Sequence, residues 1–278
     1  MRKICAFVVL LTLPWAVQAA EPAPVSLWRL DCGAIQESDL NNFSDIDAYT
    51  GQSRRLTVSC YLIKHGDTYM LWDTGLPDED LGLPLEGPRS TGETVARLLP
   101  DELAAIGVKP EQIAIVAVSH YHLDHTGQAH HFPQARLLMG KGDIAALRSA
   151  TEPFAKEHAK PLEHWLSGGG KLEEVDGDKD VFKDKSVVML SLPGHTPGHH
   201  GLLVRLAGKG VVLLSGDVAH FRENYENNGV PKFNVDRAQS LASIDRFKGL
   251  AKNLHATVVI QHETGDIGKL PAFPNFAK

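Results

Sequence analysis

The chain has 278 residues, enough for one large domain or two small ones with a substantial buried core. Hydrophobic residues make up 43% of it and charged residues 22%, which is ordinary for a globular protein. The 34 acidic residues outnumber the 28 basic ones, and because phosphate backbones attract the opposite charge, nucleic acid is not an expected partner.

The first residues have the pattern of a secretory signal peptide over residues 1–19. Two basic residues precede an apolar run, and small residues follow it. The run is too short to span a membrane as a helix, so we expect cleavage after Ala19, with Ala20 as a second cut site and an uncleaved anchor as the alternative. The mature chain would keep 26 basic and 34 acidic residues, a formal charge of −8. We expect it to be periplasmic or secreted, with no membrane association after cleavage.

Two cysteines, Cys32 and Cys60, would remain in the mature chain. An oxidising compartment permits a disulfide between them. Two separate buried thiols are the alternative, since the sequence does not show whether the two side chains face each other.

The first predicted elements form a hairpin. Residues 56–63, LTVSCYLI, carry apolar side chains at alternate positions, which predicts a strand. Residues 68–72 predict its partner, and His65-Gly66-Asp67 is the turn between them. The second strand ends at Asp73-Thr74-Gly75.

A loop, a helix and a buried strand are predicted next. Residues 76–92 are rich in Gly, Pro and Leu and indicate a loop. The spacing of apolar residues predicts a helix over 91–106, interrupted at Pro100. Residues 113–118, IAIVAV, have no polar face, so we expect a strand buried on both sides.

The rest of the chain alternates predicted strands and helices. Helices are expected over 141–165, where a Gly run ends the pattern, and over 237–254. Strands in hairpins and strands between helices together fit two mixed sheets packed on each other and covered by helices, an α/β (α+β) fold. No linker divides the chain, so residues 20–278 are expected to form a single domain. The further predicted strands lie at residues 135–139, 186–192, 201–206, 210–214 and 256–260.

Three histidines and an aspartate follow the strand at 113–118, in the stretch SHYHLDHTG. His120 and His122 alternate on extended backbone, so both side chains can point the same way. Asp124 can cap the next helix and still offer a carboxylate, and His125 comes directly after it. One loop can therefore present ligands to two adjacent ions. Imidazoles with a carboxylate suit zinc or a similar transition metal better than calcium or magnesium.

Metal-capable side chains also follow three later predicted strands. His195 lies in PGHTPGHH, Asp217 in SGD with His220 three residues on, and His262 in QHE. Placing polar groups just beyond the ends of buried strands is how α/β scaffolds build sites. The sequence therefore predicts one metal centre assembled from distant segments.

The ordered motifs HxHxDH, GHTPGH, SGD and a terminal histidine resemble the metallo-β-lactamase superfamily over nearly all of the mature chain. The resemblance implies a four-layered αβ/βα sandwich with a metal pair at its edge. Two Zn²⁺ are expected, and Co²⁺, Mn²⁺ or Fe²⁺ would fit the same ligands. By motif position the first ion would be held by His120, His122 and His195, the second by Asp124, His125 and His262, with Asp217 bridging the two.

A closer resemblance, to the N-acyl-homoserine lactonases, is carried by VSHYHLDHTGQ, LPGHTPGHHGLLV and GDVAHFRENYENNGVPKFNVDRAQSLASIDRFKGLA. It implies a hydrolase that opens the lactone ring of a small-molecule acyl lactone, with a homodimer left open as the assembly. The β-lactamases of the superfamily commonly have a cysteine near the chain position that Asp217 occupies here, and this chain has no cysteine after Cys60. The lactonases often have a tyrosine where this chain has His220, whose imidazole can also donate a hydrogen bond.

The resemblance also implies a mechanism, in which a hydroxide shared by the two ions attacks the ester carbonyl carbon. Asp124 is the expected proton shuttle to the departing ring oxygen, and His220 an extra donor to the substrate, with a surface histidine as the alternative. Asp73 is expected to orient a ligand histidine, unless it only caps a turn. An acyl chain needs an apolar groove, and packing on the core is an equal alternative for the loop leucines among the candidate residues. These candidates are Leu81, Leu83, Leu85 and Phe221.

The remaining histidines are expected to be solvated or to cap local structure. His130 and His131 lie past the HxHxDH motif, and His199 and His200 follow the Pro-Gly turn. The others, which have no motif around them, are His65, His158, His164 and His255.

Rival functions for the site are an organophosphate or arylester hydrolase, a β-lactamase, a glyoxalase-II-type thioesterase and a periplasmic zinc-binding protein without catalysis.

Overall fold

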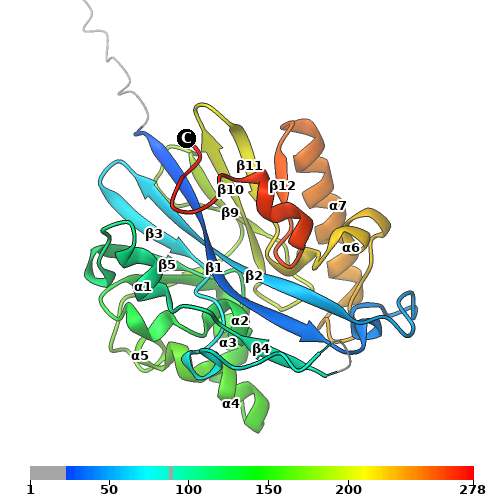
Figure 1. Ribbon diagram of the computed structural model, residues 1–278. Helices are drawn as coiled ribbons and strands as arrows, with labels where there is room; N and C mark the ends of the chain where they lie inside the picture. The colour runs from blue at the N-terminus through cyan, green and yellow to red at the C-terminus, as the bar shows by residue number, and fades with distance from the viewer. Residues whose placement is uncertain (1–22, 88–89) are drawn as a thin grey trace, which may run out of the picture.

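The computed structural model describes residues 23–87 and 90–278, and two β-sheets that face each other form its centre (Figure 1). The predicted signal peptide of residues 1–19 lies outside these residues. Within them, no helix combines the length and the apolar character needed to cross a membrane.

The first sheet has seven strands in the order β4-β1-β2-β3-β5-β6-β7. The long strands β1 and β2 pair antiparallel, as do β2 and β3, whereas β3, β5, β6 and β7 run parallel. Parallel strands end at the same edge of a sheet, so the loops after β3 and β5 start side by side. The strands of this sheet are β1 (Val25–Glu37), β2 (Arg54–His65), β3 (Thr68–Trp72), β4 (Gly92–Thr94), β5 (Ile113–Ala117), β6 (Arg136–Gly140) and β7 (Leu172–Val175).

The second sheet has five strands in the order β12-β11-β10-β9-β8. All of its pairs are antiparallel except β11 and β12, which are parallel. The loops after β11 and β12 therefore also start at one edge. The strands are β8 (Lys179–Asp180), β9 (Val187–Ser191), β10 (His200–Leu206), β11 (Gly210–Leu214) and β12 (Thr257–Val259).

Helices cover the outer face of each sheet, which gives the four layers that the sequence predicted (Figure 1). Five α-helices accompany the first sheet: α1 (Leu99–Ala104), α2 (Leu123–Thr126), α3 (Lys141–Arg148), α4 (Pro153–Ala159) and α5 (Glu163–Leu166). The second sheet is covered by α7 (Arg237–Asn253), with α6 (Arg222–Asn227) beside it. Short 3₁₀ helices are η1 (Leu40–Phe43), η2 (Asp78–Asp80), η3 (Pro110–Gln112), η4 (Ala129–His131), η5 (Lys160–Leu162), η6 (Gly216–Val218) and η7 (Thr264–Lys269).

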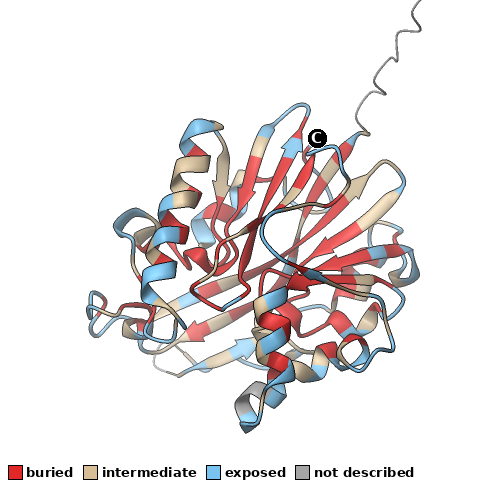
Figure 2. Cartoon of the chain, turned by 180° about the vertical axis from the view of Figure 1, so that it is seen from behind, coloured by how far each residue is buried: buried red, intermediate tan, exposed pale blue. Residues whose placement is uncertain are grey.

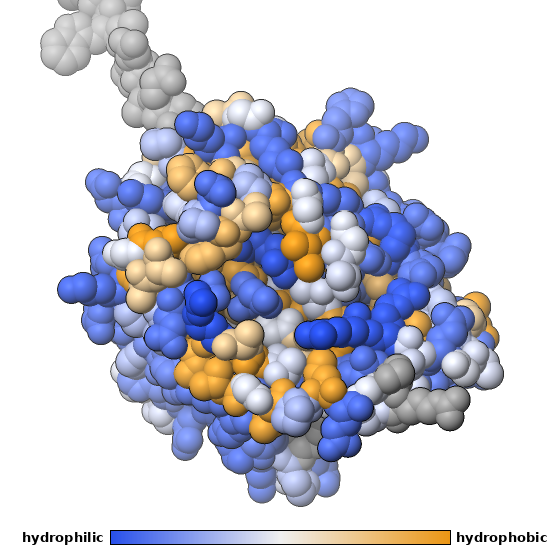
Figure 3. All heavy atoms as spheres, viewed as in Figure 1, coloured by the Kyte–Doolittle hydropathy of each residue, from blue (hydrophilic) through white to orange (hydrophobic). Residues whose placement is uncertain are grey.

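Strand β2 shows how the sequence builds these layers. Val58, Cys60 and Leu62 point to the helices of the first sheet, whereas Tyr61 and Ile63 point to the second sheet. Both faces of the strand are thus covered, and Figure 2 shows the same burial along most strands of the two sheets. On the face seen in Figure 3, hydrophilic residues separate the hydrophobic ones into patches.

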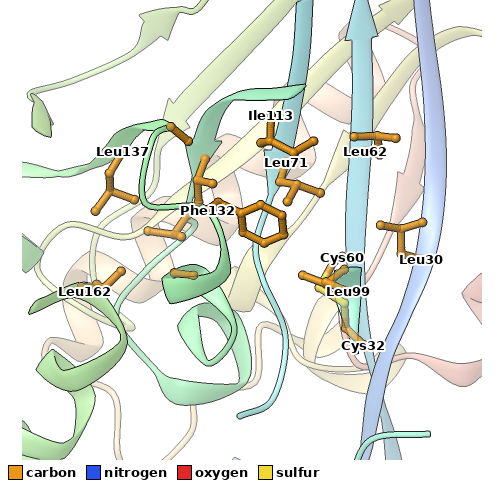
Figure 4. Packing of buried hydrophobic residues seen from close by; sticks show 14 of the residues in the cluster. Leu30, Cys32, Cys60, Leu62, Leu71, Leu99, Ile113, Phe132, Leu137 and Leu162 are labelled. Atoms are coloured by element: carbon orange, nitrogen blue, oxygen red, sulfur yellow. A yellow bond between two sulfur atoms is a disulfide. The ribbon is translucent and has the colours of Figure 1, made fainter. Parts of the chain in front are cut away.

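The two cysteines form a disulfide, which decides between the alternatives that the sequence left open. Cys32 on β1 and Cys60 on β2 are bonded with an S–S distance of 2.02 Å, and both are fully buried. Figure 4 shows the bond among the apolar side chains between the first sheet and its helices. The crosslink therefore joins the two longest strands of the sheet inside its core.

Several predicted boundaries were wrong, most of them near prolines or glycines. The helix expected over 91–106 begins only at Leu99, because Pro100 fits the first turn of a helix and not its middle. Gly92–Thr94 instead pairs with β1 as the edge strand β4. The helix expected over 141–165 is divided into α3, α4 and α5, with Pro153 at the start of α4. Strand β1 was missed, since a bulge between Asp31 and Gly33 breaks its alternation.

Candidate metal centre

All seven residues predicted as metal ligands lie at the ends of strands, at one edge of the sandwich. His120 and His122 follow β5, and Asp124 and His125 belong to the short helix α2. The other three follow strands of the second sheet: His195 after β9, Asp217 in η6 after β11 and His262 after β12. The structure thus brings together segments that span more than half of the chain, in two groups that share Asp217.

Three imidazoles form the first group. The Nε2 atom of His120 lies 2.8 Å from Nδ1 of His122, and Nε2 of His195 lies 3.0 Å from each of those atoms. Asp217 Oδ2 approaches to 3.5 Å from His195 Nε2 and 3.8 Å from His120 Nε2. A tetrahedral zinc ion with bonds of about 2.0–2.1 Å separates its ligand atoms by roughly 3.3 Å, so this group has the size of such a site.

Two carboxylates and two imidazoles form the second group. Asp124 Oδ2 lies 3.3 Å from Nε2 of His125 and 3.4 Å from Nε2 of His262. The other oxygen of Asp217, Oδ1, lies 3.4 Å and 3.1 Å from the same two nitrogens. Asp217 therefore turns one oxygen to each group, which is the arrangement of a carboxylate that bridges two ions.

The two groups differ in charge. Burial lowers the pKa of His120 and His122 well below the ordinary value, and it lowers the pKa of His195 to about 4, so the first group consists of neutral imidazoles. Burial acts in the same direction on His125 and His262, but Asp217 and Asp124 outweigh it and raise both pKa values. Neutral imidazole and ionised carboxylate are the forms that bind metal.

The buried polar atoms of the centre fit a pair of divalent ions. In the part of the chain that the structure describes, His125 Nε2 and Asp217 Oδ1 are buried without a hydrogen-bond partner. The described ion-pair partners of Asp73, Asp124 and Asp217 are all histidines. Two buried carboxylates and a third that is largely covered, without Lys or Arg, need other positive charge, and cations held between the imidazoles would supply it.

Hydrogen bonds from the surrounding residues hold the ligand rings in place. Asp73 lies where the sequence placed it, with Oδ2 at 3.0 Å from Nδ1 of His125 and Oδ1 accepting from the Ser119 amide at 2.6 Å. Its backbone adopts φ +59°, uncommon outside glycine, at the turn after β3. The sequence did not single out Asn234, whose Oδ1 lies 2.9 Å from Nδ1 of His195.

His199 and His200 were expected to be solvated or to cap local structure, and the solvated alternative is wrong because both are buried. Nδ1 of His199 donates to the Leu192 carbonyl at 2.9 Å, and its Nε2 accepts from the Asp217 amide at 2.8 Å. His199 therefore holds the backbone of the shared carboxylate, and its place as the last histidine of GHTPGH was the available signal. His158, also expected to be solvated, is buried as well.

The loop that carries His195 is fixed by a residue that no sequence pattern had indicated. The fully buried Asp143 of α3 accepts from the Gly198 amide at 2.6 Å and from the Thr196 hydroxyl at 2.9 Å. A Cβ atom at Gly140 would lie 1.9 Å from the Gly198 carbonyl, so the start of α3 and this loop meet where only glycine fits. The glycines of GHTPGH thus have a packing role.

His220 lies between the two groups, with its ring 5.1 Å from that of His195, and faces Asp217. Its Nε2 is 3.1 Å from Asp217 Oδ2, its ring stacks on His262 at 5.6 Å, and its Nδ1 is buried without a described partner. Phe221 does not line a groove, contrary to the expectation, because it is fully buried in a cluster with Phe43 and Tyr49. Leu81 and Leu83 are exposed, and Leu85 is half-buried.

Comparison with known proteins agrees with this geometry. An N-acyl homoserine lactonase from Bacillus cereus is 28% identical over 236 residues, which cover 81% of this chain and 89% of the relative. The N-acyl homoserine lactonase AttM from Rhizobium radiobacter is 29% identical over 192 residues, 63% of this chain and 68% of the relative.

A solved structure of an N-acyl homoserine lactone hydrolase, with the product N-hexanoyl-L-homoserine at the catalytic metal centre, shares the fold with a TM-score of 0.77. It is 24% identical, and the match covers 92% of this chain and all of the other. The family model of the metallo-beta-lactamase superfamily matches residues 53–262, which contain all seven of the predicted ligands. The chain belongs to the metallo-beta-lactamase superfamily.

Proposed function

We propose that this protein is a dinuclear metal hydrolase that opens the lactone ring of N-acyl homoserine lactones. The observation that carries the proposal is the pair of ligand groups joined by Asp217, in a chain that resembles named N-acyl homoserine lactonases over 81% of its length. A bridging carboxylate in place of a thiol supports ester hydrolysis over β-lactam hydrolysis.

Two divalent ions, expected to be Zn²⁺, fit the imidazole and carboxylate donors. One would be held by His120, His122 and His195, the other by Asp124, His125 and His262, and Asp217 would join them. When bound, such a pair lowers the pKa of water toward about 7 and polarises the ester carbonyl.

Asp124 is the residue best placed to move a proton. Although burial raises its pKa, the neighbouring His125 and His262 lower it, so the carboxylate is ionised and can accept a proton before passing it to the ring oxygen. Its side chain is 16% exposed, against 4% for Asp217. A substrate can therefore reach the carboxylate of Asp124, while Asp217 stays enclosed between the imidazoles.

His220 acts through Asp217 in this proposal. Its Nε2 lies 3.1 Å from Asp217 Oδ2, and this contact orients the carboxylate between the two groups. The ring itself is held edge-on by Phe43 at 4.9 Å. The sequence had assigned His220 a contact with the substrate carbonyl, and that contact stays a prediction.

Exposed aromatic and aliphatic residues beside the centre offer a surface for the acyl chain. Phe233 is 45% exposed, and its ring lies 5.8 Å from His195 and 5.7 Å from His220. Val235 and Ile46 are exposed as well. Such a surface can bury part of an alkyl chain at roughly 0.8 kcal/mol for each methylene removed from water.

We further propose that the protein works in the periplasm or outside the cell. The basic and apolar pattern of residues 1–19 supports export, and the buried disulfide between Cys32 and Cys60 suits an oxidising compartment.

Ring opening releases a proton, so turnover can be followed with a pH indicator on lactones of several acyl lengths. Nitrocefin and paraoxon serve as parallel substrates, with and without a chelator. We expect lactone turnover that a chelator abolishes. In Asp217→Asn, turnover should fall by more than the ~10–100-fold that is typical when a residue hydrogen-bonded to a metal ligand is replaced. Exposed Asp67, in the hairpin turn, gives the matched control Asp67→Asn. Absence of lactone turnover from protein that holds two metal equivalents would refute the proposal.

A further inference from the structure

Outside the metal centre, three more metal-capable side chains converge at the surface. Nε2 of His131 lies 3.0 Å and 2.9 Å from the two carboxylate oxygens of Asp78. Nε2 of His130 lies 3.3 Å from Oδ2 of the same carboxylate. The three ligand atoms all lie within 4.8 Å of one another. No sequence motif connects them, since Asp78 is more than fifty residues before the histidines.

The backbone holds the two segments in this relation. The Gly127 amide donates to the Gly75 carbonyl at 2.8 Å, and the buried Gln128 side chain donates to the Leu76 carbonyl at 2.9 Å. A Cβ atom at Gly127 would lie 2.4 Å from the nitrogen of Pro77, so the segments are in direct contact just before Asp78. The three side chains therefore start from a fixed frame, which reduces the entropy cost of binding an ion.

The donor set suits a transition metal. Two imidazoles and one carboxylate are ligands that zinc, nickel and copper accept. The His131 and His130 contacts to Asp78, at 2.9–3.3 Å, approach the roughly 3.3 Å that a tetrahedral zinc ion imposes on its ligands. Each ring needs only to move its proton from Nε2 to Nδ1 to present a lone pair.

The surroundings leave this cluster open to ions from solution. The side chains of His130, His131 and Asp78 are 47%, 26% and 32% exposed. His130 also lines a small cavity of about 180 Å³ together with Glu79, Glu157 and Lys160, and the last two form an ion pair at 2.6 Å. Glu79 therefore adds negative charge beside the cluster, which attracts cations, and the exposed face leaves a coordination position for water.

We infer that Asp78, His130 and His131 form a third transition-metal site, separate from the proposed dinuclear centre. It would take Zn²⁺, Ni²⁺ or Cu²⁺ with three protein ligands. An ion there would link η2 to η4, the 3₁₀ helix that follows the HxHxDH motif. The exposed residues Leu81 and Leu83 come just after η2, so the link also fixes the start of their segment.

The test counts metal equivalents after equilibrium dialysis of the full protein against buffered free zinc, and separately against nickel, with elemental analysis of each sample. We expect the wild type to hold one equivalent more than Asp78→Asn, His131→Gln and the double variant His130→Ala/His131→Ala. The control His164→Ala, which removes an exposed histidine elsewhere, should match the wild type. Because protons compete for imidazole nitrogen, the extra equivalent should also be lost in acid.

Equal metal content in the wild type and all three variants, at every free-metal concentration, would overturn the inference. The conservative variants Asp78→Asn and His131→Gln keep the result interpretable if the double variant folds poorly. Lactone turnover is measured on the same samples and should be retained in all variants. A protein without lactonase activity that still loses one equivalent on His131→Gln would refute the proposed function and leave the third site standing.

Discussion

Asp73 is not among the predicted metal ligands, yet the segment after β5 that carries four of them depends on it. One carboxylate oxygen faces the His125 ring and the other accepts from the Ser119 amide, so a single buried side chain fixes a ligand and the strand end before it. Burial raises the pKa of Asp73, and the nearby His125 and the Ser119 hydrogen bonds oppose that rise. Burial thus costs the Asp73 carboxylate its solvation, and the same burial lets it orient His125 and the Ser119 amide.

Replacing Asp73 by Asn keeps the shape but turns one acceptor oxygen into an NH₂ donor. Either the His125 contact or the Ser119 contact is then lost, and the affinity for zinc should fall by about 10–100-fold. Competition with a chromophoric chelator measures this directly. Asp67→Asn, in the exposed hairpin turn, is the control and should leave the affinity unchanged. An Asp73→Asn protein that binds zinc as tightly as the wild type would show that Asp73 only caps the turn.

A substitution that keeps an aromatic ring but removes the Nε2 group tests whether His220 acts through this nitrogen or only by packing. His220→Phe keeps an aromatic ring against Phe43 but removes the 3.1 Å contact of Nε2 with Asp217, so kcat should fall by about tenfold or more, the value of one polar contact to a charged group. The affinity for metal should fall with it, because Asp217 is less well oriented. His220→Tyr keeps a donor and should be the milder change. If kcat falls in His220→Phe while metal affinity stays intact, the histidine acts on the substrate and not through Asp217.

At the scale of elements, regular patterns were predictable and long-range pairings were not. The runs at 56–63 and 113–118 predicted β2 and β5 because both carry apolar residues in strand patterns. Strand β4 has three residues and is defined only by its pairing with β1, so no local sequence pattern predicts it. The seven predicted ligand residues could be singled out because each follows a buried strand. The contacts of His199 and Asp143 could not be predicted, since their partners, the Asp217 and Gly198 amides, are set by tertiary contacts.

The junction of α3 with the loop after β9 gives a prediction about pH. Burial is the largest influence on Asp143 and raises its pKa from 3.8 to about 7, against the hydrogen bonds from Gly198 and Thr196. Between pH 3.8 and about 7, the Asp143 carboxyl therefore keeps its proton in the folded state, whereas the unfolded chain has released it. Its contribution to the free energy of unfolding is complete below the unfolded pKa and is lost as the pH rises toward the folded one.

An asparagine side chain does not titrate, so the destabilisation by Asp143→Asn should be larger near pH 5 than near pH 8. We expect a cost of about 1–3 kcal/mol at the lower pH, because asparagine offers one acceptor oxygen where the Gly198 amide and the Thr196 hydroxyl both donate. Denaturant unfolding of both proteins at saturating zinc measures the difference, and effects of pH on the metal centre cancel between them. A cost that grows with pH would mean that Asp143 is ionised in the fold.

Across the whole molecule, the geometry of the metal centre depends on the stability of the strands that carry its residues. The disulfide joins β1 to β2, and the Leu76 amide after Asp73-Thr74-Gly75 donates to the Cys32 carbonyl. A Cβ atom at Gly75 would lie 2.6 Å from that of Cys32, so the crosslinked strand packs directly on this turn. Loss of the crosslink should therefore weaken the fold first and the site through it.

The double variant Cys32→Ala/Cys60→Ala tests this connection. The two cysteines are 28 residues apart, and closing a loop of that size is worth about 3–4 kcal/mol in the chain-entropy account. For a domain of this size Tm should fall on the order of 10 °C. Val58→Ala, at an equally buried position on the same face of β2, separates lost packing from the lost crosslink.

The two causes differ in the denaturant dependence of unfolding. Removing the crosslink lets the unfolded chain expand and expose more surface, so the m-value should rise in the double cysteine variant and stay constant in Val58→Ala. Lactone turnover well below Tm should persist in both, because neither change removes a ligand or a partner of a ligand. An unchanged m-value together with a loss of Tm no larger than that of Val58→Ala would mean that Cys32 and Cys60 stabilise the protein by packing alone.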